Sequence, residues 1–562
     1  MEGFFVDGSL KIKLVSSLEK NFLDEKLEDK KVFNKASMLK NERYSFQIAY
    51  IETNSEIFGK RMGTVEIKSD LKSCITLRRV ELIPAQLPAY TSIDDNYLRV
   101  EPGLFPDELV DIQEGEKLYL VPNQLRSIWV TIEGSDKIKP GVHPIEINFY
   151  GEQGELLASD TFMLEIIDAM LPKQDLIVTQ WFHCDCLAVE YNVEILGEEH
   201  WRIIGNYIKN AVKNGMNMIL TPIFTPPLDT AIGGERPTVQ LVEIDKIGVN
   251  KYKFEFTKLK RWIDMCLEGG IEYFEISHLF TQWGAKHAPK IMGTENGEYK
   301  KLFGWETDAA SEEYAVFLRF FLTELVEFLK AEGIEEKCYF HISDEPELQH
   351  LENYMSAKNI VKDILKEFPI IDALSDYTFY ANGSVKNPIP ANNHIDKFIE
   401  NQVPSLWTYY CCAQYQQVSN RFFSMPSLRN RIIATQFYKY NIAGFLHWGY
   451  NFWFNQYSRK PINPFHVTDG EFFVPSGDTF VVYPGKDGQP IESLRLVVFY
   501  EALQDLRAFK LLESIFDKEF VIKLIEEDTG KPITFKEYPK KDEYLLELRE
   551  KVNQLIKEKM QK

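Results

Sequence analysis

Two adjacent carboxyl side chains, Asp344 and Glu345, carry the clearest chemical potential in this chain. They follow an apolar stretch, residues 338–342, that is typical of a buried strand. Because neighbouring carboxylates repel, the pKa of one rises, and the pair then offers an anion beside an acid that still donates a proton near neutral pH. A glycosidase needs these two groups. The alternative is a solvated turn, in which the acids only cap a helix starting at Pro346.

Aromatic and polar side chains gather directly after other apolar stretches. Tryptophan and tyrosine present flat apolar faces with a hydrogen-bonding edge, which matches the surface of a pyranose ring. Aromatic rings also fill protein cores, so the conjunction with acids and histidines is what favours a sugar pocket. The predicted substrate-binding residues are His183, His278, Tyr377, Trp407, Tyr409, His447, Trp448 and Asn451.

Other chemistries lack their motifs in this sequence. It contains no P-loop, no glycine-rich dinucleotide turn after a strand and no G-x-S-x-G elbow. His183, Asp185 and His278 are conceivable metal ligands, but they lack the close spacing of a metal motif. We therefore predict no metal and no cofactor. The seven scattered cysteines predict reduced thiols.

The elements that must position these residues follow from the pattern beyond residue 175. Short apolar stretches alternate there with amphipathic ones, which predicts parallel strands connected by helices. Eight strands would close a (β/α)8 TIM-like barrel, whose chemistry lies on the loops after the strands. The predicted strands cover residues 176–178, 218–220, 271–276, 338–342, 370–374, 395–399, 405–409 and 443–446. The predicted helices cover residues 201–213, 259–267, 312–331 and 351–367.

The first 170 residues instead alternate with the period of half-buried strands. Tyr44, Phe46, Ile48 and Tyr50 are separated by polar residues such as Gln47. Turn residues separate several such stretches, so we predict an antiparallel β-sandwich over residues 1–172. The barrel domain, residues 173–562, includes a charged C-terminal helical extension whose apolar stripe is expected to pack on the barrel. The fold is thus multidomain, β plus α/β.

Size and charge limit the partners. The 562 residues exceed one ordinary core, and 84 acidic against 64 basic residues give a net charge of −20. This surface repels nucleic acid and anionic membranes. No apolar run reaches the roughly 20 residues of a membrane-spanning helix, and residues 1–7 lack the basic and apolar regions of a signal peptide. We expect a cytoplasmic protein with an oligosaccharide substrate; the oligomeric state is not predicted.

Short motifs in order along nearly the whole chain resemble glycoside hydrolase family 123, particularly its clostridial-type β-N-acetylgalactosaminidases. They follow a predicted sandwich and comprise Gln180-Trp181-Phe182-His183, Ser343-Asp344-Glu345-Pro346, Tyr483-Pro484, Ser493-Leu494-Arg495 and Glu501-Ala502-Leu503-Gln504-Asp505. The resemblance implies release of terminal β-linked N-acetylgalactosamine, including from glycosphingolipid-type glycans. It also implies that an adjacent Asp-Glu pair, here Asp344 and Glu345, works together with the acetamido group of the substrate.

Residue geometry agrees with that implication. Glycosidases with two carboxyl groups across the sugar hold them about 5 Å apart or roughly 6.5–9.5 Å apart. Adjacent side chains straddle a glycosidic bond poorly, but they serve two points of a 2-acetamido sugar. Glu345 is expected to act as acid and base, Asp344 to orient the acetamido group, Tyr409 or Tyr410 to hold its oxygen, and Trp448 to lie under the ring.

Two alternatives stay open from the sequence. An N-acetylglucosaminidase differs only in the 4-hydroxyl orientation of its substrate, which no residue here specifies. A non-catalytic carbohydrate-binding protein would keep the aromatic cleft without using the acids.

Overall fold

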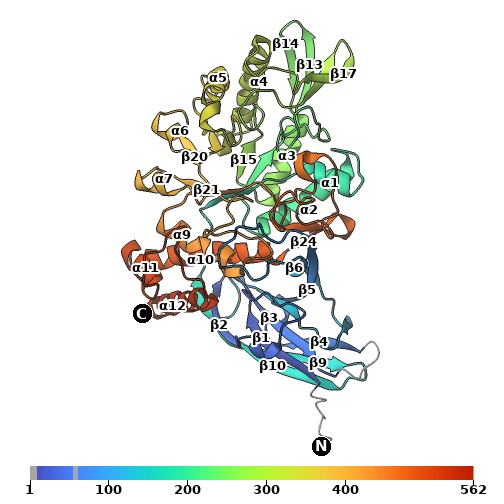
Figure 1. The fold of residues 1–562 in the computed structure, drawn as a ribbon, viewed down its shortest axis with the longest axis vertical. Coiled ribbons are helices and arrows are strands. Elements are labelled where there is room, and N and C mark those ends of the chain that lie inside the picture. The colour runs from blue at the N-terminus through green and yellow to red at the C-terminus, as the bar shows by residue number, and fades with distance from the viewer. Residues whose placement is uncertain (1–8, 55–60, 561–562) are drawn as a thin grey trace, which may run out of the picture. The chain divides into compact units, whose positions relative to one another are not determined.

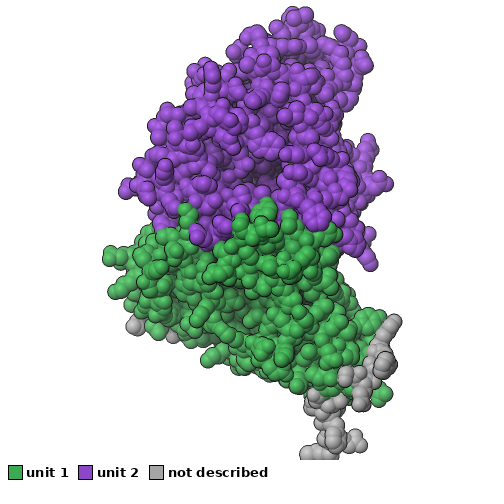
Figure 2. All heavy atoms as spheres, viewed as in Figure 1, with its two compact units in different colours: residues 1–174, 419–439, 491–562 green, residues 175–418, 440–490 purple. Residues whose placement is uncertain are grey.

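The computed structural model describes residues 9–54 and 61–560, which form two compact units (Figure 2). The first unit consists of residues 1–174, 419–439 and 491–562, and the second of residues 175–418 and 440–490. The predicted barrel domain of residues 173–562 is thus divided between the two units.

Two five-stranded sheets form most of the first unit (Figure 1). Their strands pair antiparallel, except that β2 and β10 are parallel. One sheet has the order β1 (Leu10–Ser16), β3 (Arg43–Glu52), β8 (Arg126–Glu133), β5 (Ile75–Ala85) and β6 (Gly103–Asp111). The other has the order β2 (Lys35–Lys40), β10 (Leu156–Met170), β9 (Gly141–Gly151), β4 (Met62–Lys68) and β7 (Leu118–Tyr119).

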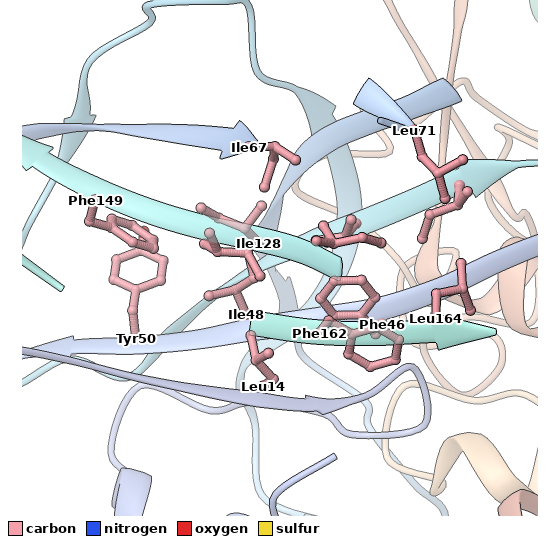
Figure 3. Packing of buried hydrophobic residues seen from close by; sticks show 14 of the residues in the cluster. Leu14, Phe46, Ile48, Tyr50, Ile67, Leu71, Ile128, Phe149, Phe162 and Leu164 are labelled. Carbon is pink, nitrogen blue, oxygen red and sulfur yellow. The ribbon is translucent and has the colours of Figure 1, made fainter. Parts of the chain in front are cut away.

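Side chains from both sheets meet in one apolar core (Figure 3). Phe46 of β3 stacks on Phe162 of β10 with ring centroids 4.0 Å apart, and Ile48 is fully buried as its alternation predicts. Gln47, predicted to face solvent, is also buried. Its amide donates to the backbone oxygens of Ser16 and Glu19, so residues 16–22 cover the outer face of β3.

Five helices from later in the chain complete the first unit. They are α8 (Ser427–Arg431), α9 (Ile433–Lys439), α10 (Leu494–Ile515), α11 (Lys518–Glu526) and α12 (Asp542–Met560). The apolar stripe of α12 packs against β2, β10 and α10. Its predicted packing on the barrel is therefore wrong, because Glu550 and Lys557 of α12 bond to Ser37 and Glu165 of the sandwich.

Buried ion pairs join these helices to one another and to the sandwich. Arg431 bonds to Glu501 and Asp505, and Arg549 bonds to Asp505 and to Glu42. Arg495 of α10 makes a two-point pair with Asp107 of β6. Each of these carboxylates faces an arginine, which offsets the cost of burying its charge.

Parallel strands form the centre of the second unit. Six of them have the order β18 (Cys338–Phe340), β15 (Tyr273–Ile276), β12 (Met218–Thr221), β11 (Ile177–Gln180), β22 (Gly444–His447) and β21 (Trp407–Tyr409). β19 (Ile371–Ala373) and β20 (Asn387–Ile389) form a separate parallel pair. The prediction of parallel strands alternating with helices is confirmed, but the six-stranded ladder is open, so a closed barrel is not established by pairing.

The helices between these strands include the predicted ones, except that the helix predicted for residues 351–367 ends at Val361 and residues 362–367 form turns. These helices are α1 (Cys184–Glu190), α2 (Glu198–Lys213), α3 (Thr257–Gly269), α4 (Glu312–Ala331), α5 (Leu351–Val361), α6 (Thr378–Ala381) and α7 (Asp396–Glu400). The bounds of α4 are those predicted, since Ser311 caps its first turn and seven aromatic or leucine side chains form its buried face.

One predicted strand is wrong. Residues 396–399 lie in α7 instead and Ile395 is its N-cap, because Ile395 and Phe398 are three residues apart and are buried on one side of this turn. The missing strand is β20, whose three residues are followed by Pro390. So short a strand leaves almost no alternation to detect.

The remaining strands lie outside the parallel sheets. β13 (Glu243–Gly248), β14 (Lys251–Glu255), β16 (Ile291–Glu295) and β17 (Glu298–Phe303) form a four-stranded sheet beside α4 (Figure 1). β23 (Val482–Pro484) and β24 (Pro490–Glu492) follow later in the chain. Among the described residues, no helix combines the length and the apolar character needed to cross a membrane.

Candidate active site

A cavity of about 210 Å³ lies among the loops that follow the parallel strands of the second unit. It contains both predicted acids, and aromatic rings make up much of its wall. Its lining is Trp181, His183, Leu228, Asp229, Gln282, Trp283, Asp344, Glu345, Ala373, Tyr409, Cys411, Cys412, Leu446, Trp448, Phe452 and Phe473.

The acid pair is fixed through its backbone. The N–H of Trp283 donates to the Asp344 oxygen at 3.0 Å, and the N–H of Glu345 donates to the Ala373 oxygen at 3.1 Å. Glu345 has φ +44°, in the left-handed region that costs a residue with a Cβ about 1–2 kcal/mol. Neighbouring strand ends hold this strained conformation, as is common at functional sites. The cap position of the next helical turn belongs to Glu347, not to the pair.

Electrostatics in the cavity favour protonated carboxyl groups. Burial, followed by the charge of Glu345, raises the pKa of Asp344 well above its ordinary 3.8. Burial also raises the pKa of Glu345, although a hydrogen bond from the Tyr409 hydroxyl at 2.7 Å opposes that rise. Tyr409 stays a neutral donor, because burial raises its own pKa well above 10. The pair is therefore able to retain a proton near neutral pH.

A buried charge network lies beneath the pair. Nε2 of His341 lies 2.6 Å from Glu275, and its Nδ1 lies 3.4 Å from Asp372. Burial lowers the pKa of His341, but these two carboxylates outweigh burial and raise it to about 9. Glu275 also accepts the indole N–H of Trp181 at 2.7 Å. The network thereby fixes one aromatic wall of the cavity.

Both ring nitrogens of His183 have protein partners. Its Nδ1 accepts from Arg236 at 3.2 Å and its Nε2 lies 2.9 Å from the Trp448 oxygen. Burial and the Arg236 charge lower the pKa of His183 to about 3, so the ring is neutral. The same guanidinium pairs with Asp185 at 2.7 and 2.8 Å. An arginine thus joins two of the three conceivable metal ligands, and no described group of His, Cys, Asp and Glu side chains is arranged to hold a metal ion.

Trp448 forms the wall beside His183. Its indole N–H donates to Asp478 at 2.8 Å, and its ring centroid lies 5.0 Å from that of Phe452. These contacts fix the ring plane against the cavity, as a platform for a sugar requires.

Five predicted binding residues are not part of the cavity lining. Asn451 bonds to both backbone groups of His183, and His278 stacks on His341 with ring centroids 4.2 Å apart. His447 accepts the Gly449 N–H, Trp407 packs against Tyr339 in an apolar cluster, and Tyr377 packs against Phe398. The structure therefore brings Asp344, Glu345, His183, Tyr409 and Trp448 together in the lining, whereas the other five contact protein side chains or backbone outside it.

Several lining residues were not predicted. Trp181, Gln282, Trp283 and Phe452 belong to strand-end segments that the sequence already marks as aromatic and polar. Asp229 belongs to the loop after β12, a strand end that carries no aromatic cluster. Its position after a predicted strand is the only sequence signal that points to it.

A strained pair of carboxyl groups among aromatic rings, at the carboxyl ends of parallel strands, is the site of a glycoside hydrolase. The model of the glycoside hydrolase 123 catalytic domain matches residues 181–512. The chain belongs to glycoside hydrolase family 123, as its resemblance predicted.

A solved structure shares the fold. The chain is similar to a family 123 glycoside hydrolase from Clostridium perfringens, with a TM-score of 0.73 and 16% identity over 98% of this chain and 97% of that one. A β-glucuronidase from Bifidobacterium dentium shows a TM-score of only 0.30 and 9% identity over 89% and 66% of the two chains. Comparison with curated proteins gave no match.

Proposed function

We propose that this glycosidase releases terminal β-linked N-acetylgalactosamine from oligosaccharides, with retention, through an oxazolinium intermediate. The observation that carries the proposal is the pairing of Asp344 and Glu345 on one backbone segment, with Glu345 at φ +44°. Two acids so close together suit two neighbouring points of a 2-acetamido sugar better than opposite faces of a glycosidic bond. The similar Clostridium perfringens enzyme is described as acting in glycolipid glycan hydrolysis, which agrees with this substrate class.

Glu345 carries the proton in the first step. It protonates the glycosidic oxygen while the acetamido oxygen of the substrate attacks the anomeric carbon and the leaving group departs. Glu345 then removes a proton from water, which attacks the anomeric carbon and opens the oxazolinium ring. Each of the two attacks inverts the configuration of the anomeric carbon, so the product keeps the β configuration.

Asp344 acts as the anion that accepts the acetamido N–H. Burial raises the pKa of Asp344, so substrate binding must favour its charged form. Donation of a hydrogen bond by the acetamido N–H has this effect, and the positive oxazolinium ring strengthens it. The proton of the pair then belongs to Glu345.

Tyr409 links these two protonation changes. Its hydroxyl donates to Glu345, which favours ionised Glu345. If the acetamido oxygen takes over this donor, Glu345 loses a partner of its charged form and becomes the better acid. Trp448 is proposed to lie under the sugar ring. His278, His447, Asn451, Trp407 and Tyr377 are proposed to hold the wall that binds the substrate.

We also propose that the eight parallel strands act as one (β/α)8 barrel. Single parallel bridges join Phe340 to Ile370 and Ala391 to Tyr409, on the two sides of the β19–β20 pair. These bridges support closure of the ring between β18 and β21, and a barrel would place every strand end around the acid pair.

Three 4-nitrophenyl β-glycosides test the proposal: those of N-acetylgalactosamine, N-acetylglucosamine and galactose. Release from the first, with the β-anomer as the initial product by NMR, is expected. Preference for the second would establish the glucosaminidase alternative, and release from none would favour a binding protein. Equal rates on galactose, which lacks the acetamido group, would refute substrate assistance.

A further inference from the structure

The aromatic rings of the cavity differ in exposure. Trp181 is 3% exposed and Phe452 is buried, whereas Trp283 is 41% exposed although it lines the same cavity. Trp283 therefore lies at the mouth of the cavity. Its backbone N–H donates to the Asp344 oxygen, which keeps this exposed ring next to the acid pair.

The mouth is built from three loops bonded to one another. The backbone N–H of Asp229 donates to Gln282, the residue before Trp283, at 2.6 Å. Oδ2 of Asp229 accepts the backbone N–H of Tyr457 at 3.0 Å, and the Tyr457 ring meets Trp283 edge to face with centroids 6.1 Å apart. The loops after β12, β15 and β22 thus hold Trp283 and Asp229 as one assembly.

Backbone strain is concentrated in this assembly. Asp229, Trp283 and Tyr457 have φ of +37°, +57° and +60°, in the left-handed region that side chains rarely adopt. Such conformations persist where the surroundings impose them, and they cluster at ligand-binding sites.

Asp229 keeps one oxygen for a ligand. Its Oδ2 is used by Tyr457, and in the described part of the chain no protein donor bonds to Oδ1. Arg236, whose charge acts on this carboxylate, is engaged by Asp185. A carboxylate oxygen beside an exposed indole face is the combination that binds a sugar, because one accepts a hydroxyl and the other stacks on the ring.

We infer that Trp283 and Asp229 form a second sugar position at the cavity mouth, which binds the sugar on the leaving-group side of the cleaved bond. The inference rests on the proposed function: an exo-acting enzyme holds the terminal sugar inside, so the rest of the glycan leaves through the mouth. Trp283 stacks on this second sugar and Asp229 accepts one of its hydroxyls. The substrate class is accordingly an oligosaccharide rather than a simple glycoside.

The test compares two substrates in each variant at pH 7.5. One is a trisaccharide ending in β-linked N-acetylgalactosamine; the other is methyl N-acetyl-β-galactosaminide, whose leaving group has no ring. Trp283→Ala should lower kcat/KM for the trisaccharide about tenfold more than for the methyl glycoside. Asp229→Asn keeps an oxygen for Tyr457, and its additional loss on the trisaccharide should be about 10- to 100-fold.

Phe472→Ala is the matched control, since Phe472 is 66% exposed but lies outside the cavity lining. Its ratio between the two substrates should equal that of the unchanged protein. Equal losses on both substrates in Trp283→Ala and Asp229→Asn would overturn the second sugar position while leaving the proposed function intact. If the unchanged protein cleaves neither substrate, the proposed function itself fails.

Discussion

Two sets of buried carboxyl groups, one in each unit, have opposite surroundings. In the first unit Asp107, Glu42 and Asp505 each face an arginine at 2.7–3.1 Å. In the cavity of the second unit no described lysine or arginine lies within ion-pair distance of Asp344 or Glu345, and the pKa of both is raised. The acids paired with arginine hold the parts of the first unit together. The acids of the cavity lower the stability of the fold, and we attribute their retention to the proton transfer of the proposed reaction.

The largest effect should come from the unpaired acids. Asp344→Asn should lower kcat/KM on 4-nitrophenyl N-acetyl-β-galactosaminide about 10³-fold, because the acetamido group loses its anionic partner. Steady-state kinetics measure this loss. Glu345→Gln is the companion variant, and its loss should be smaller on 4-nitrophenyl than on methyl glycosides, whose leaving group needs a proton. Near-normal turnover by Asp344→Asn would contradict the assigned role.

The paired acids should affect stability instead. Arg431→Met leaves Glu501 and Asp505 short of a buried partner and should lower the free energy of unfolding by about 3–5 kcal/mol. Urea unfolding followed by circular dichroism measures this change. Lys72→Ala removes an exposed ion pair with Glu114 and should leave the unfolding midpoint unaltered. If Arg431→Met also lost activity per folded molecule, this would contradict the conclusion that the paired acids act on stability alone.

Tyr409 provides an intermediate case, because it is a neutral partner of an unpaired acid. Tyr409→Phe should lower kcat/KM about 10- to 100-fold. Its hydroxyl lowers the pKa of Glu345, so its removal should raise that pKa and move the basic limb of the pH–rate profile to higher pH. Rates between pH 4 and pH 9 test this. A basic limb that stays in place or moves to lower pH would count against proton donation by Glu345.

The smallest effect should be a gain in stability. The pKa of Asp344 is raised in the folded protein, so its ionisation opposes folding increasingly as pH rises above about 4, the value in an unfolded chain. Asp344→Asn does not ionise and should be more stable than the unchanged protein by ~1 kcal/mol at pH 8. The difference should disappear near pH 4. Thermal unfolding of both proteins at the two pH values provides the measurement. If the variant and the unchanged protein are equally stable at pH 8 as well as at pH 4, the pKa of Asp344 is not raised in the folded protein.

The parts of the fold visible in the sequence are those with local periodicity. Helix α4 and strands β3 and β22 have apolar patterns that burial alone explains, so their positions were predictable. The three-residue strand β20 has no such pattern. The packing of α12 on the sandwich depends on pairs such as Glu42–Arg549, whose members are 507 residues apart, and no local pattern reveals them.

The sequence predicted which residue types form the site better than it predicted where each side chain lies. Asp344, Glu345 and the aromatic strand ends are marked by residue type. How deep a side chain of a short strand lies is not marked: Tyr409 lines the cavity, whereas Trp407, two residues earlier on the same face of β21, packs against Tyr339 and is not part of the lining. His183 and His278 look alike in the sequence, and only the folded chain shows that Arg236 bonds to one and His341 stacks on the other.

The discontinuous first unit also affects how the protein is made. Glu42 and Asp107 leave the ribosome long before Arg549 and Arg495, the arginines that bond to them. At translation speeds of about 5–20 residues per second, Glu42 waits roughly 25–100 s for Arg549. During synthesis the sandwich strands therefore exist without the helices that cover them, and a chaperone that shields their sheet faces would have its greatest effect in that interval.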